Sequence, residues 1–196
     1  MNKWDSINLD ENEKPRLSYK DKSSLNDQLK LVFESIVSSK RGIGTLSNGG
    51  LPGPFNGWMY TDAKLASALD TIGIAIRENT TKVPEVMKQI SICCIAVYYK
   101  ANVEYWAHSR LAKINGVPNE VLESMLNEQY PLFDDSDEGH KQEIAYRFTQ
   151  EFLQSYEVSD SLYNEIYINH AFFACVVFCM CLRVPWWNHG QQTSSC

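Results

Sequence analysis

The sequence contains no dense run of lysine or arginine, which a nucleic-acid-binding protein needs in order to contact the phosphate backbone. Its 196 residues include 18 basic and 24 acidic side chains, so the formal net charge is −6. An acidic balance of this kind mainly favours solubility. The composition therefore argues against DNA or RNA as a partner.

Long apolar runs are also missing. The longest one, over residues 171–182, is shorter than the roughly 20 residues that a helix needs to cross the hydrocarbon core of a bilayer. Residues 1–22 are polar and charged and lack the apolar segment of a secretory signal peptide. We therefore expect no membrane partner and a cytoplasmic location.

The six cysteines do not form the spaced framework of a disulfide-rich secreted protein. Five of them lie inside apolar runs, where a free cysteine behaves as a small hydrophobe. Cys175, Cys179 and Cys181, with His170 nearby, share one such run instead of bracketing a turn. This favours core packing over a zinc site, so we expect a reducing compartment and no metal.

Strand-like alternation and fixed-period repeats are absent as well, and the periodicity that is present is helical. Apolar residues recur at helical spacing from Leu25 to Ile36, and a stretch rich in glycine and proline follows. Pro84 suits the first turn of a third helix, whose wide apolar face predicts a central position. The expected helices span about residues 25–40, 65–76, 84–97, 103–114, 119–127, 144–153 and 159–183.

The expected fold class is therefore all-α. A chain of this length fits a single domain. We expect a polar N-terminal arm over residues 1–22, one multi-helix domain over residues 23–185 and a polar tail over residues 186–196.

The clearest chemical signal lies between Lys100 and His108. In a helix, Glu104 and His108 are four residues apart and share a face, so their side chains can form a hydrogen bond. A carboxylate beside an imidazole fixes the imidazole tautomer and favours its protonated form. Such a pair can transfer a proton near neutral pH. The same spacing is also common on solvated helices, so the pair alone indicates chemistry only weakly.

An unusually aromatic segment closes the glycine-rich stretch. It contains Phe55, Asn56 and Trp58 and precedes the second expected helix. Aromatic side chains in such a segment can line a pocket, or they can simply pack over the core. Both interpretations remain open from the sequence.

Several segments, taken in order, resemble the carboxymuconolactone decarboxylase family, the relatives of the alkylhydroperoxidase AhpD. Glu104-Tyr105-Trp106-Ala107-His108 resembles the family's Glu-Trp-x-Ala-His pattern, and a Leu-Ala-x-x-x-Gly-Val stretch follows it. Gly53-Pro54-Phe55-Asn56-Gly57-Trp58 resembles an upstream family segment. Further similarities lie at residues 158–160 and 183–185, so the resemblance covers about residues 40–185.

The resemblance implies an all-helical, AhpD-like fold that assembles into trimers or hexamers. It also implies a cleft near the Glu–His helix, with no metal and no organic cofactor. In decarboxylating members a general acid delivers a proton to the carbon that loses carbon dioxide. By this resemblance His108 is the candidate acid, and Glu104 orients it. The candidate substrate-binding residues are Phe55, Asn56, Trp58, Gln89 and Trp106.

Two departures from the family pattern limit the chemistry. The redox members carry Cys-x-x-Cys where this chain has Ala101 and Glu104, so no dithiol can form there. Many members carry a glutamate where this chain has Gln89, and an amide cannot carry a proton at neutral pH. We expect a decarboxylase-like lyase acting on a small carboxylated or carbonyl metabolite. An isomerase or cyclase, a thiol-dependent reductase and a non-catalytic oligomeric binding protein are the alternatives.

Overall fold

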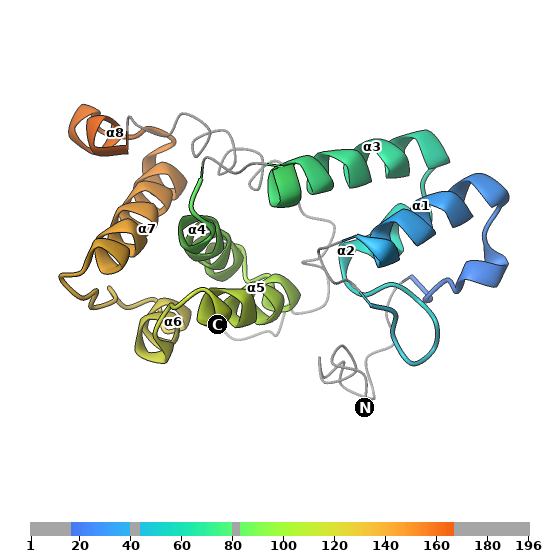
Figure 1. Cartoon of the computed structure of the whole chain (residues 1–196), viewed down its shortest axis with the longest axis horizontal. Helices are drawn as coiled ribbons and strands as arrows, with labels where there is room; N and C mark the ends of the chain where they lie inside the picture. The colour runs from blue at the N-terminus through green and yellow to red at the C-terminus, as the bar shows by residue number, and fades with distance from the viewer. Residues whose placement is uncertain (1–16, 40–43, 80–82, 167–196) are drawn as a thin grey trace, which may run out of the picture. The chain divides into compact units, whose positions relative to one another are not determined.

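The structure is a computed structural model that describes residues 17–39, 44–79 and 83–166 (Figure 1). Within these ranges the regular structure is helical, and the β pairing is limited to one isolated bridge between Asp21 and Gly50. The expected all-α class is confirmed for this part of the chain. The chain divides into two units, residues 1–80 and residues 81–196, each with its own apolar core.

The first unit contains two twelve-residue helices, each of which begins after a capping side chain. The side-chain oxygen Oδ1 of Asn26 accepts a hydrogen bond from the Leu29 backbone amide, and Oδ1 of Asp62 accepts one from the Leu65 amide. Each cap satisfies an amide that has no partner inside the helix. The elements of this unit are η1 (Lys22–Ser24), α1 (Asp27–Ser38), α2 (Pro54–Trp58), α3 (Ala63–Ile74) and the π-helical turn η2 (Ala75–Asn79).

The core of the first unit forms along one face of α1, as the apolar spacing predicts. The last residues of the expected arm also belong to this unit. The Asn56 side chain accepts a hydrogen bond from the Lys20 backbone amide at 3.1 Å and donates one to the Ser18 carbonyl at 3.3 Å. The buried core residues are Leu25, Leu29, Val32, Phe33, Ile36, Leu51, Met59 and Ala66.

The second unit is arranged around α4, which packs against α5, α6 and α7 (Figure 1). Each residue from Val86 to Ala96 is buried, which confirms the predicted central position. Pro84 lies one position before the first helical residue and not inside the first turn. The elements of this unit are α4 (Glu85–Tyr98), α5 (Asn102–Ile114), α6 (Asn119–Leu126), α7 (Asp137–Ser155) and α8 (Asp160–Ile166).

The helix α7 begins earlier than the expected range of 144–153, at Asp137. The Ser136 hydroxyl accepts a hydrogen bond from the Gly139 backbone amide and caps the helix, so Asp137 and Glu138 form its first turn. Acidic residues are favourable there because they face the positive end of the helix dipole. Gly139 lies so close to the Asp134 carbonyl that a β-carbon would overlap it.

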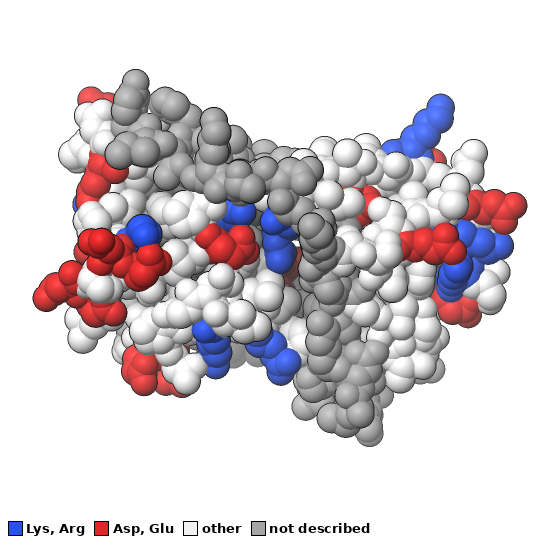
Figure 2. All heavy atoms as spheres, in the orientation of Figure 1, with Lys and Arg blue, Asp and Glu red and all other residues white. Residues whose placement is uncertain are grey.

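Cys93 and Cys94 are free and buried, as the apolar run predicts. Among the described residues, no helix combines the length and apolar character needed to cross a bilayer. The same residues contain no group of three or more potential metal ligands. Basic side chains on the face drawn in Figure 2 stand beside acidic ones. The cysteines at 175, 179 and 181, most of the last expected helix and the tail over residues 186–196 lie outside the described residues.

Candidate functional site

Glu104 and His108 lie one turn apart on α5, as the sequence predicts. The distance between Nε2 of His108 and Oε2 of Glu104 is 3.3 Å. The His108 side chain is only 10% exposed and the Glu104 side chain 26% exposed. The pair is therefore largely withdrawn from water and is not a solvated surface pair.

The other ring nitrogen of His108 meets α4. Oε1 of Gln89, a fully buried side chain, lies 2.8 Å from Nδ1 of His108. Gln89 is thus a direct neighbour of the imidazole although nineteen residues separate the two along the chain. Both ring nitrogens have a polar partner, because Glu104 faces Nε2.

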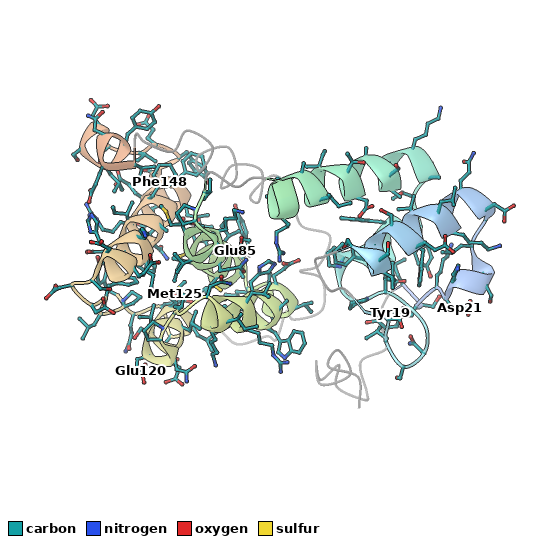
Figure 3. The ribbon with its side chains drawn as sticks, viewed as in Figure 1. Tyr19, Asp21, Glu85, Glu120, Met125 and Phe148 are labelled. Atoms are coloured by element: carbon teal, nitrogen blue, oxygen red, sulfur yellow. The ribbon has the colours of Figure 1, made fainter. Side chains whose placement is uncertain are left out.

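Two further charged residues extend this contact along α4. Nε2 of Gln89 donates a hydrogen bond to Oε1 of Glu85 at 2.5 Å. Nζ of Lys88 lies 3.2 Å from Oε2 of Glu85, and the Lys88 side chain is only 6% exposed. We call the five side chains the polar chain; Figure 3 marks Glu85 on α4. Its members, in order of contact, are Lys88, Glu85, Gln89, His108 and Glu104.

Glu85 and Lys88 were not predicted from the sequence as members of the site. Glu85 precedes Gln89 by four residues, which is the same spacing that singled out Glu104 and His108. That spacing was the available signal for Glu85. Lys88 had none, because lysine is rarely buried and its position on a helix does not indicate burial.

The link between α4 and α5 explains why these residues meet. Lys100 adopts a φ of 52°, in the left-handed region that commonly ends a helix. The Ala101 amide then donates a hydrogen bond to the Ala96 carbonyl. Since only three residues connect the two helices, they pack as neighbours. The Tyr105 hydroxyl donates a hydrogen bond to the Leu122 carbonyl at 2.6 Å and ties α5 to α6.

Hydrogen-bond chemistry fixes where the protons lie in the polar chain. A carboxylate can only accept, so the Gln89 nitrogen must face Glu85, and the Gln89 oxygen must face His108. An amide oxygen also only accepts, so Nδ1 of His108 carries a hydrogen. An unprotonated Nε2 would then point its lone pair at the Glu104 carboxylate, which is unfavourable. A favourable contact needs one proton between Nε2 and Oε2.

Trp106 lies two residues from both members of the pair, on a different face of α5, because residues two apart do not face each other on a helix. It is half-buried, and the Arg110 guanidinium lies over its ring at 4.0 Å from the centroid. This is cation–π geometry on the helix surface. A role for Trp106 in binding substrate stays a prediction.

The aromatic segment belongs to the first unit. The rings of Phe55 and Trp58 pack edge to face with centroids 4.7 Å apart, against the core of that unit. Asn56 holds residues 18–20, as described above. These contacts are packing contacts of the first unit. The role of the three residues in binding substrate stays a prediction.

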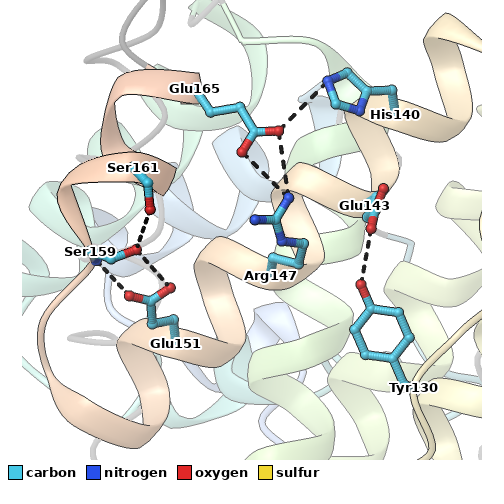
Figure 4. Close-up of polar contacts among 8 residues, drawn as sticks. All are labelled: Tyr130, His140, Glu143, Arg147, Glu151, Ser159, Ser161 and Glu165. Carbon is cyan, nitrogen blue, oxygen red and sulfur yellow. Dashed lines mark hydrogen bonds and ion pairs between the residues drawn. The ribbon is translucent and has the colours of Figure 1, made fainter.

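A second polar cluster ties α8 to α7 (Figure 4). Nη1 of Arg147 lies 3.4 Å and 3.5 Å from the two carboxylate oxygens of Glu165. Nε2 of His140 lies 3.8 Å from Glu165, and the His140 side chain is 59% exposed. Exposed ion pairs of this kind contribute little to stability. We interpret the cluster as a structural contact, in which the His140 side chain is exposed to solvent.

The chain matches no protein-family model, no curated protein and no solved structure. A functional conclusion therefore has to come from the chemistry of the polar chain.

Proposed function

We propose that the chain is a cofactor-independent, decarboxylase-like enzyme in which the Glu104–His108 pair transfers a proton to a small carboxylated or carbonyl-bearing metabolite. The observation that carries the proposal is that Gln89 contacts Nδ1 of His108 while Glu104 contacts Nε2, an arrangement that is favourable with one proton between Nε2 and Oε2. The resemblance to the carboxymuconolactone decarboxylase family supports the same reaction class, and with it a homo-oligomer.

The proposed step needs an electron sink in the substrate. The bond between the carboxylate and its neighbouring carbon breaks, carbon dioxide leaves, and the electron pair passes into a conjugated carbonyl as an enolate. The pair then delivers its proton to the carbon that lost carbon dioxide, and solvent restores that proton. The substrate class is therefore an acid whose carboxylate lies β to a carbonyl, directly or through a double bond.

Two features favour Glu104 as the group that meets the substrate. Both ring nitrogens of His108 already have partners. Glu104 is also the more exposed member of the pair. In this proposal His108 holds and orients the proton, and Glu104 donates it to the substrate. The family resemblance implies the opposite roles, with His108 as the acid and Glu104 as the orienting residue.

A thiol-dependent reaction is less favoured. Burial raises the pKa of the Cys94 thiol well above its usual value, so Cys94 is not a thiolate at neutral pH. Cys93, its neighbour, is also buried. Neither cysteine of α4 is suited to replace the missing dithiol.

One observation favours a non-catalytic binding protein as the second candidate. A buried histidine with both nitrogens satisfied is also what a purely structural core histidine looks like. An isomerase or cyclase would use the same proton within one substrate. The three possibilities differ in what happens to turnover and product when the pair is changed.

The test starts from the organism's metabolites because the substrate is not named by the site. Deleting the gene should cause an acid of the stated class to accumulate. Purified protein should convert that compound with release of carbon dioxide. His108→Asn and Glu104→Gln should each lower turnover by about 10²–10⁴-fold, the usual contribution of a general acid.

His140→Asn is the matched control, because it makes the same change at an exposed histidine of the same unit. It should leave turnover unchanged, and all variants should keep the helical circular-dichroism spectrum. Undiminished turnover in His108→Asn would reject the proposal. Turnover without carbon dioxide would point to an isomerase or cyclase, and no turnover of any accumulated compound would favour the binding protein.

A further inference from the structure

We infer that Glu85 is a positioning residue. Through the Gln89 amide it keeps the Glu104–His108 pair in the form that carries the additional proton. Glu85 touches neither member of the pair: its contacts are Nε2 of Gln89 and Nζ of Lys88. The importance of this proton for catalysis rests on the proposed function. The effect of Glu85 on the protonation of the His108 ring does not.

The protonation of the pair depends on which way the Gln89 amide points. An amide can rotate by 180° and exchange its oxygen and nitrogen with almost no change in shape. With Glu85 present as a carboxylate, rotation would bring the Gln89 oxygen against the Glu85 oxygen, which is repulsive. Glu85 therefore selects the orientation in which the Gln89 oxygen faces His108.

The two orientations differ by one proton at the pair. In the observed orientation Nδ1 carries a hydrogen, and a further proton lies between Nε2 and Glu104. In the rotated orientation the Gln89 nitrogen would donate to Nδ1, and the single hydrogen of a neutral ring would sit on Nε2 and be donated to the Glu104 carboxylate. His108 and Glu104 would then be satisfied with one proton fewer. The hydrogen that remains would belong to a neutral imidazole, and the additional proton that the pair can transfer would be absent.

Lys88 supports this selection. Its ammonium group lies 3.2 Å from the second oxygen of Glu85, and its side chain is almost fully buried. An ammonium group can only donate, so this contact holds one Glu85 oxygen as an acceptor while the other oxygen accepts from Gln89. The imidazole thus faces Glu104 of α5 directly, and Glu85 and Lys88 of α4 lie beyond Gln89.

The test measures the protonation of the His108 ring nitrogens directly and needs no substrate. Nitrogen-15-labelled full-length protein is studied at neutral pH by long-range proton–nitrogen correlation, which distinguishes a protonated Nδ1 from an unprotonated one. The His108 signal is assigned by its loss in His108→Asn. In the unmodified protein we expect a hydrogen on Nδ1.

In Glu85→Gln we expect the ring to shift to the neutral form with its hydrogen on Nε2, and in Lys88→Met a shift in the same direction. Glu120→Gln is the matched control, since it removes the same charge from the exposed first turn of α6 (Figure 3). It should leave the His108 signal unchanged. Glu85 is only partly buried, so its isosteric replacement preserves the fold, which circular dichroism checks.

An unprotonated Nδ1 in the unmodified protein would overturn the inference. An unchanged ring signal in Glu85→Gln would overturn it as well. These outcomes are separate from the fate of the proposed function. If Glu85→Gln shifts the ring while His108→Asn keeps full turnover, the inference stands and the enzyme proposal falls. If His108→Asn abolishes turnover while Glu85→Gln leaves the ring unchanged, the reverse holds.

Discussion

The two units bury polar side chains in different ways. In the first unit, α3 buries only Ala66 and Asp70 of its twelve residues, and the Ser35 hydroxyl donates a hydrogen bond to Asp70 at 2.5 Å. In the second unit, α4 buries eleven of its fourteen residues, among them Lys88 and Gln89. A helix with one buried stripe can turn most of its polar groups to water. A helix buried on every side has to pair them with one another.

This difference teaches where chemistry can be built. Buried polar groups need partners with good geometry, because an unpaired group costs about 1–3 kcal/mol. Pairing on α4 therefore produces a continuous network that reaches His108 and Glu104 on α5. In the first unit the buried Asn56 side chain bonds instead to backbone groups of Ser18 and Lys20. If the comparison is right, changes on α4 and α7 should cost more than similar changes in the first unit.

The largest effect is expected from the core around α4. Phe148 on α7 is fully buried in the second unit's core (Figure 3), so Phe148→Ala should destabilise the protein by about 3–5 kcal/mol through lost burial and the cavity left behind. In the first unit, Phe33→Ala makes the same deletion at a core side chain that is 5% exposed, and it should cost less. Urea unfolding followed by circular dichroism measures both.

Leu132→Ala is the control for these core variants. Its side chain belongs to the same unit as Phe148 but is 89% exposed, so its stability should change by less than about 0.5 kcal/mol. A comparable loss in Phe148→Ala and Leu132→Ala would show that the core does not lie where the burial of Phe148 puts it.

The next effect compares one buried amide in each unit. Gln89→Leu leaves Nδ1 of His108 without this partner, and a buried group of this kind costs about 1–3 kcal/mol. Oε1 of Glu85 also loses its partner, but Glu85 is partly exposed and loses less. Asn56→Leu removes hydrogen bonds to the backbone at Lys20 and Ser18, which water can replace. The loss of unfolding free energy should therefore be at most about 0.5–1.5 kcal/mol per hydrogen bond. Equal losses of unfolding free energy would break the comparison.

Helix positions could be predicted from the sequence because the signals are local. The apolar spacing from Leu25 to Ile36 and the cap at Asp62 act within a few residues. Contact between Glu104 and His108 follows from the helical repeat alone. Gly116, with a φ of 88°, ends α5 as its place after the last apolar residue indicates.

The remainder of the site could not be derived in this way. Gln89 meets His108 across two helices, so the contact depends on how α4 and α5 pack, and only the family resemblance pointed to that position. The burial of Lys88 depends on elements that cover α4 from several sides. The sequence could not decide whether Phe55 and Trp58 line a pocket or pack over the core, because an aromatic segment has the same composition in both cases.

Helix caps should affect the two units equally. Asp62→Ala in the first unit and Ser136→Ala in the second each remove a side-chain acceptor for a helix N-terminal amide. Each should cost about 0.5–2 kcal/mol, since the cap acts locally. Thermal unfolding of the two variants provides the comparison. A much larger loss for Ser136→Ala would show that the capping turn also holds the core of the second unit.

The smallest effect concerns alkaline pH. Burial raises the pKa of Tyr146 to about 12, and that of Tyr105 is raised for the same reason. Both phenols are neutral when folded, so their contribution to stability is complete below the unfolded pKa of about 10 and is lost as the pH rises towards 12.

The corresponding measurement is the urea midpoint between about pH 9 and pH 11. Tyr146→Phe should show a smaller fall over this range than the unmodified protein. Tyr19 in the first unit is shifted in the same direction by burial, and Tyr19→Phe serves as its counterpart. A fall that is identical in the unmodified protein and Tyr146→Phe would contradict the role of this phenol.

The close approach of Gly139 to Asp134 has a consequence for which sequences can encode this fold. A β-carbon at position 139 would collide with backbone, which cannot rotate away as the end of a flexible side chain could. In a library holding every single substitution, position 139 should retain glycine alone, while exposed Asp137 two residues earlier accepts many replacements. Two positions in the first turn of α7 should therefore differ sharply in their tolerance to substitution: position 139 accepts only glycine, and position 137 accepts many residues.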